Sequence, residues 1–256
     1  MQIKKIYLFG SNGFVANGFK SFFKKKKIKF YSINKSNYSK YKNTYCDVFF
    51  NLNGSSSKLL ANKDFLKSFR KNVTSTIKTF NDFKIEKYVY ISSCSVYSNL
   101  QKKNKTKESS IIDINFLDNY GFLKAICEQI VKRKSKNFLI IRPSGFVGHG
   151  LKKNVIFDFL NKKNLYDNKN STFNFIDTKH FAEIVFKLSQ RKNNEIYNVA
   201  AKKNIKVSEI NNLFFKKSVK FTKSNLKKNE ISVSKLLKFT KLNDSQDYIN
   251  QYYNKL

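Results

Sequence analysis

Three of the eight glycines in this 256-residue chain lie within its first 20 residues, directly after a short apolar segment. That segment, residues 3–9, has the length and composition of a buried strand. Gly10 and Gly13 bracket a tight turn after it, and Phe14, Phe19 and Phe22 then recur at helical spacing. A strand, a glycine-rich turn and a helix in this order present backbone N–H groups and a helix N-terminus to an anion.

The spacing of the small residues in this turn narrows the identity of the anion. Gly10, Gly13 and Ala16 follow a variant of the fingerprint of dinucleotide-binding turns, with Ala16 where the helix must pack closely on the strand. The alternative is an ordinary connection between a strand and a helix. The sequence therefore favours a pyrophosphate site but does not require one.

The end of the second predicted strand, residues 28–33, bears on the type of dinucleotide. An acidic residue about 20 positions after the glycine turn would bind the ribose 2′-hydroxyl of NAD. Asn34 stands there instead, followed by Lys35. A neutral residue beside a cation would tolerate a 2′-phosphate and favours NADP, unless Lys35 is one more surface lysine.

Further apolar segments at residues 45–52, 87–91 and 137–141 alternate with helical patterns such as 64–83. This alternation predicts a parallel sheet, and ligands of such sheets bind at the carboxyl ends of the strands. The glycine and serine clusters of the chain all follow a predicted strand. We therefore expect an α/β fold of the Rossmann type, a doubly wound parallel sheet with a small mixed C-terminal substrate lobe.

Tyr120 and Lys124 stand four residues apart at the start of a predicted helix and so share one face of it. A nearby ammonium stabilises a phenolate, so we expect Lys124 to lower the Tyr120 pKa from its usual value of about 10. Such a tyrosine exchanges protons with an alcohol or ketone near neutral pH. A serine hydroxyl at the end of the fourth strand would hold the substrate oxygen.

The order and spacing of several segments resemble the extended short-chain dehydrogenase/reductase superfamily, in its NAD-dependent epimerase/dehydratase branch. The matching segments span nearly the whole chain: GSNGFVANGF, DVFFNLNGSS, KNVTST, KYVYISSCSVYS, NYGFLKAICEQIV, LIIRPSGFVGHG, FNFIDTKHFAEIV and EIYNVAAKKNIKVSEI. The resemblance implies hydride transfer between a nicotinamide cofactor, NADP or NAD, and a hydroxyl or keto carbon of a nucleotide-linked sugar. Reductase and epimerase chemistry both fit.

The resemblance also implies roles for individual residues. The catalytic set would be Ser93, Tyr120 and Lys124, and Asn72 would be a structural or proton-relay residue. The cofactor would be bound by Gly10, Ser11, Asn12, Gly13, Phe14, Val15, Asn34, Lys35, Asn53, Tyr120, Lys124, Pro143 and Ser144. The substrate would be bound by Ser93, Cys94, Ser95, Tyr120, His149, Lys152, Lys153 and Asn154.

Some of these positions carry a second interpretation. Lys152 and Lys153 would meet a nucleotide diphosphate, or they are surface charge. His149 would lie near the substrate, and His180 would begin a helix; neither is expected to be catalytic. Cys94 and Cys127 are expected to be buried packing residues.

Departures from the family pattern narrow the activity further. Sugar-nucleotide 4,6-dehydratases carry an Asp-Glu pair where this chain has Cys94 and Ser95, so dehydration is disfavoured. The segment at residues 165–177 lacks the arginine that usually grips the pyrophosphate, and the third strand ends in NLNG instead of the usual HLAA. The C-terminal part is short. We expect a cofactor domain at 1–145, joined by 181–200, and a substrate lobe at 146–180 and 201–256.

The formal charge of +34 suggests a different class of protein, one that binds RNA through a basic surface without catalysis. Against this, the basic residues are almost all lysines, and nucleic-acid surfaces usually rely on arginine.

No apolar run approaches the roughly 18 residues of a membrane span. Three scattered cysteines without a CxxC predict neither a metal site nor disulfides, and favour a cytoplasmic protein. A homodimer is expected by resemblance.

Overall fold

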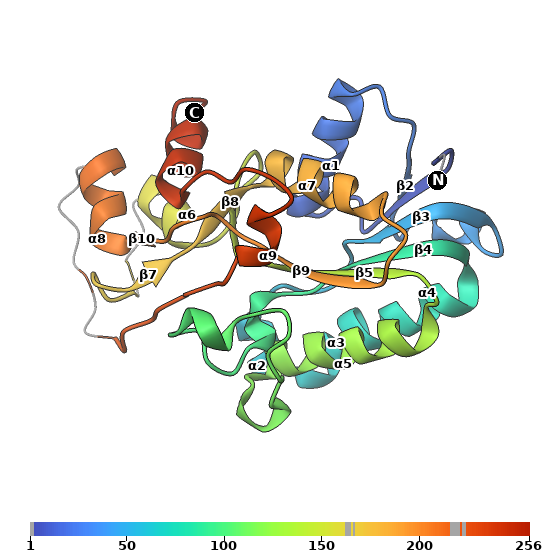
Figure 1. The fold of residues 1–256 in the computed structure, drawn as a ribbon, viewed down its shortest axis with the longest axis horizontal. Helices are drawn as coiled ribbons and strands as arrows, with labels where there is room; N and C mark the ends of the chain where they lie inside the picture. Colours follow the sequence, from blue (N-terminus) through green and yellow to red (C-terminus); the bar gives the residue numbers. More distant parts are fainter. Residues whose placement is uncertain (1–2, 162–164, 166, 216–220, 222–223) are drawn as a thin grey trace.

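A computed structural model describes residues 3–161, 165, 167–215, 221 and 224–256. Its centre is a six-stranded sheet with the order β2-β1-β3-β4-β5-β9, in which every neighbouring pair is parallel. The expected α/β class with a doubly wound parallel sheet is confirmed (Figure 1). The strands are β1 Ile6–Phe9, β2 Tyr31–Ile33, β3 Tyr45–Asn51, β4 Lys84–Ile91, β5 Phe138–Pro143 and β9 Glu195–Val199.

Helices cover both faces of this sheet, α1 and α7 on one face and α2 to α5 on the other (Figure 1). Successive strand residues serve opposite faces, so Phe50 joins the core under α1 and α7 while Phe49 joins the core under α5. The helices are α1 Phe14–Lys25, α2 Lys58–Lys63, α3 Phe65–Phe69, α4 Ser75–Asp82, α5 Asn119–Lys134 and α7 Thr178–Ser189. The helix expected over 64–83 is thus α3 and α4 joined by a π-helical segment, Arg70–Thr74.

In the rest of the described residues, two small sheets and short helices lie beside the carboxyl ends of β5 and β9. In one sheet β6 pairs with β8 in parallel, and in the other β7 pairs with β10 antiparallel. The strands are β6 Gly145–Val147, β7 Thr172–Phe173, β8 Phe175–Asp177 and β10 Ile205–Lys206; the helices are α6 Val155–Leu160, α8 Val207–Ile210, α9 Ser234–Leu237 and α10 Ser245–Tyr253, with a π-helical segment at Asn211–Phe215. Short 3-10 turns occur at Tyr38–Tyr41, Cys94–Val96, Lys103–Lys105 and Ile114–Phe116.

The strand order reverses between β1 and β3, because the chain leaves β1 for β2 on one side and returns to β3 on the other. In sheets of this kind the crevice beside such a reversal is where ligands bind. The glycine turn follows β1 and the Asn53–Gly54 turn follows β3, so both predicted loops border this crevice. Within the described residues, no helix has the length and apolar character needed to cross a membrane.

Candidate functional site

The glycine turn after β1 is packed tightly against the turn after β3. Gly10 has a φ of +82°, and a Cβ there would lie 2.7 Å from the Asn53 Cα. Both the conformation and the close approach therefore require glycine. The N–H group of Gly13 donates to the Gly10 carbonyl oxygen at 3.0 Å, and α1 begins directly afterwards. No side chain caps that helix and its first turn holds no acidic residue, which fits an anionic ligand.

The neighbouring candidates for the cofactor differ in their surroundings. Ser11 is buried, Asn12 and Gly13 are exposed, and Phe14 and Val15 are half-buried. Asn53 is fixed from both sides, because its N–H donates to Asn51 Oδ1 and its side-chain amide donates to the Ser75 hydroxyl. These bonds tie the turn to β3 and α4, and Gly10 packs closely against it.

The second cofactor region, after β2, is a side-chain-stabilised turn. Asn34 Oδ1 accepts hydrogen bonds from the N–H and the hydroxyl of Ser36, while Lys35 is exposed. The side-chain oxygen of Asn34 is thus used within the turn. Pro143 ends β5 opposite Val199.

Ser144, next to Pro143, donates its hydroxyl to Asn174 Oδ1 at 2.7 Å. That bond ties the end of β5 to the small sheets, because Asn174 directly precedes β8 and its side-chain amide donates to Ala201.

The predicted catalytic hydroxyls come together. Tyr120 lies in the first turn of α5, is buried, and has its hydroxyl beside the side chain of Ser93, which follows β4 by two residues. Ser93 Oγ also accepts the N–H of Ser95 at 3.1 Å, which begins the 3-10 turn there. Asp118 caps α5 by accepting the N–H of Gly121 at 2.7 Å. The cap and the 3-10 turn fix the two ends of the Tyr120–Ser93 contact.

Lys124 lies one helical turn after Tyr120, as the spacing predicts, and its side chain is buried. Its ammonium donates to the Ile91 carbonyl oxygen at 3.0 Å and lies 5.0 Å from the centre of the Tyr90 ring. It also faces Gly54, since a Cβ on that glycine would lie 3.8 Å from Lys124 Nζ.

Asn72, in the π-helical segment, faces the same glycine. Its side-chain N–H donates to the Ser68 carbonyl oxygen at 2.9 Å, but its buried Oδ1 has no hydrogen-bond partner among the described residues. A Cβ on Gly54 would lie 2.5 Å from that oxygen. A buried acceptor of this kind is rare, and the donor it needs is one that a ligand hydroxyl would supply. Asn72 Oδ1 and Lys124 Nζ thus form a small polar cradle over Gly54.

The predicted effect of Lys124 on Tyr120 is wrong for the protein alone. Burial raises the Tyr120 pKa to about 12, and the Ser93 side chain offsets only part of this rise. The Lys124 ammonium donates its hydrogen bond to the Ile91 carbonyl oxygen. Burial also lowers the Lys124 pKa, and the neighbouring thiol of Cys127 and carboxylate of Glu128 partly restore it.

Some of the predicted substrate residues have side chains open to a ligand, and others already use theirs in hydrogen bonds within the fold. Ser95 is half-buried, and His149 and Lys152 are exposed. Asn154 caps α6 through Oδ1, and its Nδ2 donates to the Phe146 carbonyl oxygen, so its amide is used by the fold.

Cys94 and Cys127 are buried, as expected. The Cys94 thiol donates to the Arg142 carbonyl oxygen at 3.2 Å, and burial raises the pKa of this thiol. His180 is the third residue of α7, which confirms its expected place at a helix start.

Lys153 spans the distance between two loops that are far apart in sequence. Its ammonium donates to the carbonyl oxygen of Ser56 at 2.7 Å and to the Ser56 hydroxyl at 3.0 Å. Partial burial lowers its pKa. The loop after β6 is therefore connected to the loop after β3.

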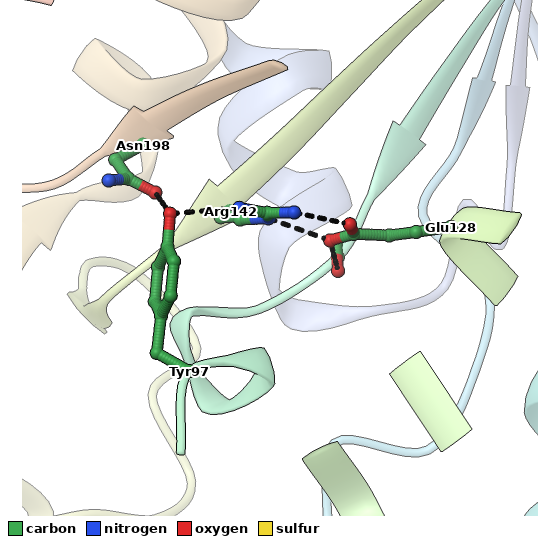
Figure 2. Close-up of polar contacts among 5 residues, drawn as sticks. Tyr97, Glu128, Arg142 and Asn198 are labelled. Atoms are coloured by element: carbon green, nitrogen blue, oxygen red, sulfur yellow. Dashed lines mark hydrogen bonds and ion pairs between the residues drawn. The ribbon is translucent and has the colours of Figure 1, made fainter. Parts of the chain in front are cut away.

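Sequence reasoning missed a buried ion pair between α5 and β5 (Figure 2). Glu128 of α5 accepts two hydrogen bonds from the Arg142 guanidinium, at 2.9 and 2.7 Å, and both side chains are at most 2% exposed. Two signals were available. Glu128 continues the four-residue spacing of Tyr120 and Lys124. Arg142 is one of only four arginines in a lysine-rich chain, and a planar guanidinium can bind a carboxylate through two hydrogen bonds where lysine cannot.

Replacing Gly121 with alanine tests how closely α5 must approach Ser93. A Cβ at Gly121 would lie 2.2 Å from the Ser95 carbonyl oxygen, so the first turn of the helix must move away. We expect turnover to fall roughly 100-fold, because a shift of about 1 Å in a reacting group costs about that factor. The measurement is steady-state turnover, with Ala125→Gly on the same helix as the control. Unchanged turnover would contradict the predicted role of this contact.

Both the sequence and the fold of this chain resemble those of known proteins. Residues 16–200 match the model of the NAD dependent epimerase/dehydratase family. No curated protein matches the sequence. Among solved structures, UDP-glucuronic acid 4-epimerase from Bacillus cereus has 18% identity over 98% of both chains with a TM-score of 0.80.

Two other solved structures are similar along their whole length. UDP-N-acetylglucosamine 4-epimerase from Methanobrevibacter ruminantium has 19% identity over 99% of this chain and 98% of its own, with a TM-score of 0.79. dTDP-4-dehydrorhamnose reductase from Bacillus anthracis has 12% identity over 100% of this chain and 99% of its own, with a TM-score of 0.79.

Proposed function

The chain belongs to the NAD-dependent epimerase/dehydratase family, and from this we propose that it is an NAD(P)-dependent reductase or epimerase acting on a nucleotide-linked sugar. The observation that supports the proposal most is the close approach of the Tyr120 and Ser93 side chains, beside the polar cradle of Asn72 and Lys124. The similar solved structures hold a UDP-sugar with NAD in one case and NADP in another.

In this mechanism Ser93 holds the oxygen of the reacting sugar carbon and Tyr120 exchanges its proton. When bound, the nicotinamide supplies the hydride acceptor or donor. Oxidation of the sugar alcohol transfers the hydroxyl proton to the Tyr120 oxygen as the C–H hydride leaves, and reduction runs both transfers in reverse. Lys124 and Asn72 would hold the ribose hydroxyls over Gly54.

The other predicted residues fit this function as follows. Gly10 to Val15 would hold the pyrophosphate, and the exposed Lys35 would meet a 2′-phosphate, which favours NADP. Neither Cys94, whose thiol is buried, nor Ser95 offers the acid and base of a dehydratase, so we favour reduction or epimerisation.

We further propose that residues 146–180 and 201–256 form the substrate lobe. Lys153 would exchange its Ser56 contacts for a substrate diphosphate, and Lys152 and His149 would line the same entrance. A cytoplasmic homodimer remains our expectation for the protein in the cell.

Titration of the freshly purified protein with NADPH and NADH tests the function, after native mass spectrometry has shown whether a cofactor is retained. We expect one dinucleotide per chain. Retained NAD would indicate an epimerase that recycles its hydride, and preference for added NADPH would indicate a reductase. Lys35→Ala should weaken NADPH binding roughly tenfold or more and leave NADH binding unchanged, because a charged hydrogen bond is lost. Lys40→Ala, another exposed lysine, is the control. Failure to bind either dinucleotide would contradict the proposed function.

A further inference from the structure

The segment that carries Ser93 is attached at both ends to the buried ion pair of Glu128 and Arg142. At the near end, Ser92 Oγ donates to Glu128 Oε1 at 2.6 Å. At the far end, Arg142 Nη1 donates to the Tyr97 hydroxyl at 2.9 Å. Between them, the Cys94 thiol donates to the carbonyl oxygen of Arg142. Residues 92–97 are thus held by one carboxylate and one arginine. Figure 2 shows the ion pair with the Tyr97 end of this network.

The same ion pair is fixed to the helix that carries Tyr120. Glu128 lies on α5 two turns after Tyr120 and one turn after Lys124. A bidentate pair between a carboxylate and a guanidinium has a defined geometry and resists sliding or rotation. Because Arg142 lies on β5, the pair fixes α5 against β5 and, through Ser92, against the end of β4.

The network continues into the C-terminal part of the chain. The Tyr97 hydroxyl donates to Asn198 Oδ1 at 2.8 Å, and Asn198 Nδ2 donates to the carbonyl oxygens of Thr106 and Ser232. Ser232 belongs to the region proposed as the substrate lobe. Polar contacts therefore run without a break from α5 through the Ser93 segment to that region.

We propose that Glu128, Arg142 and Ser92 are positioning residues that set the separation of the Ser93 and Tyr120 hydroxyls. The inference rests on the function proposed above. An ion pair that served stability alone would not need a hydroxyl from the residue next to Ser93. Ser92 provides that link, since its side chain is buried and its hydroxyl donates to Glu128 Oε1.

The test removes only this link, with Ser92→Ala. We expect kcat to fall about tenfold while the dissociation constant of NADPH or NADH and the KM stay within about twofold. The groups proposed to hold the phosphates of the dinucleotide and of the substrate are untouched, and it is the alignment of Ser93 with Tyr120 that changes. Ser92→Thr keeps the hydroxyl and should recover most of kcat. Turnover is measured with whichever UDP- or dTDP-hexose the unmodified protein converts.

Ser189→Ala is the matched control. It also removes a buried serine hydroxyl, one that donates to the Phe186 carbonyl oxygen at the end of α7, away from Ser93 and Tyr120. Both variants should lose a similar few degrees of melting temperature, about 2–4 °C for one hydrogen bond. Only Ser92→Ala should lose turnover, so equal kcat in the two variants would overturn the inference.

Hydrogen exchange at the Ser95 amide provides a readout that needs no substrate. This N–H donates to Ser93 Oγ, so its exchange rate reports where the Ser93 hydroxyl lies. We expect faster exchange in Ser92→Ala and the original rate in Ser189→Ala. Unchanged exchange in Ser92→Ala would overturn the inference on its own. If Tyr120→Phe loses turnover but Ser92→Ala turns over normally, the positioning role of Ser92 is refuted and the proposed function stands. If Tyr120→Phe itself turns over normally, the proposed function is refuted.

Discussion

Replacing Tyr120 with phenylalanine is expected to reduce turnover at least about 100-fold and to leave cofactor binding within about twofold. The ring is buried against the core, and phenylalanine keeps its shape, so the fold should not change. What is lost is the hydroxyl that lies beside Ser93 and that we propose exchanges the proton. The measurement is kcat together with the dissociation constants of NADPH and NADH. Near-normal kcat would refute the catalytic role of Tyr120.

The pH dependence of the unmodified protein gives a second check on Tyr120. Burial raises its pKa to about 12, so its phenolate form is scarce near neutral pH. Oxidation of an alcohol needs the phenolate as a base, and its kcat/KM should therefore rise with pH, about tenfold per unit, from pH 7 to 10. Ketone reduction uses the protonated form and should not rise. Tyr120→Phe should abolish the slope, and a plateau below pH 8 in the unmodified protein would contradict the raised pKa.

The parts of the site that were predictable from sequence are those fixed by local backbone chemistry. A positive φ at Gly10 and a helix beginning after Gly13 follow from strand-turn-helix patterning over a few residues. The shared helix face of Tyr120 and Lys124 follows from their spacing alone. The first and last residues of the strands were less predictable. For example, β2 begins at Tyr31 instead of residue 28, because only Tyr31–Ile33 pair with β1.

The direction of a long side chain could not be predicted in the same way. Spacing on a helix sets the position of the Lys124 Cβ, but its ammonium binds Ile91 and lies over the ring of Tyr90, which both belong to β4. Those partners are more than 30 residues away in sequence, and which atoms the ammonium reaches depends on how α5 packs on the sheet. The error in the Tyr120 pKa follows from this, since its burial is also a product of packing.

The Glu128–Arg142 pair was even harder to predict from the sequence than the direction of the Lys124 side chain. Its two residues are separated by 14 positions and lie on a helix and a strand that the sequence predicts separately. Nothing local indicates that they meet. Only the unusual chemistry of each position, an acid on a buried helix face and an arginine in a lysine-rich chain, marks them as candidates.

Arg142→Met is expected to be the most destabilising of the substitutions considered, by about 3–5 kcal/mol in the free energy of unfolding, because it leaves the Glu128 carboxylate buried and uncompensated. For a chain of this size that corresponds to a fall in melting temperature of roughly 6–20 °C, measured by calorimetry. Arg191→Met is the matched control, since Arg191 pairs with Glu195 at 3.3 Å on the surface, where an ion pair contributes about 1 kcal/mol or less. An equal effect in the two variants would contradict the assumed cost of burying a lone carboxylate.

The double variant Glu128→Gln/Arg142→Met separates stability from positioning. Removing both charges removes the uncompensated carboxylate, so most of the lost stability should return, as it does when buried ion pairs are replaced by neutral groups. The bidentate contact that fixes α5 against β5 is gone in both variants, however. If the pair positions Ser93 and Tyr120, the double variant should be nearly as stable as the unmodified protein and still turn over at a reduced kcat. Recovery of stability and kcat together would show that the ion pair serves the fold alone.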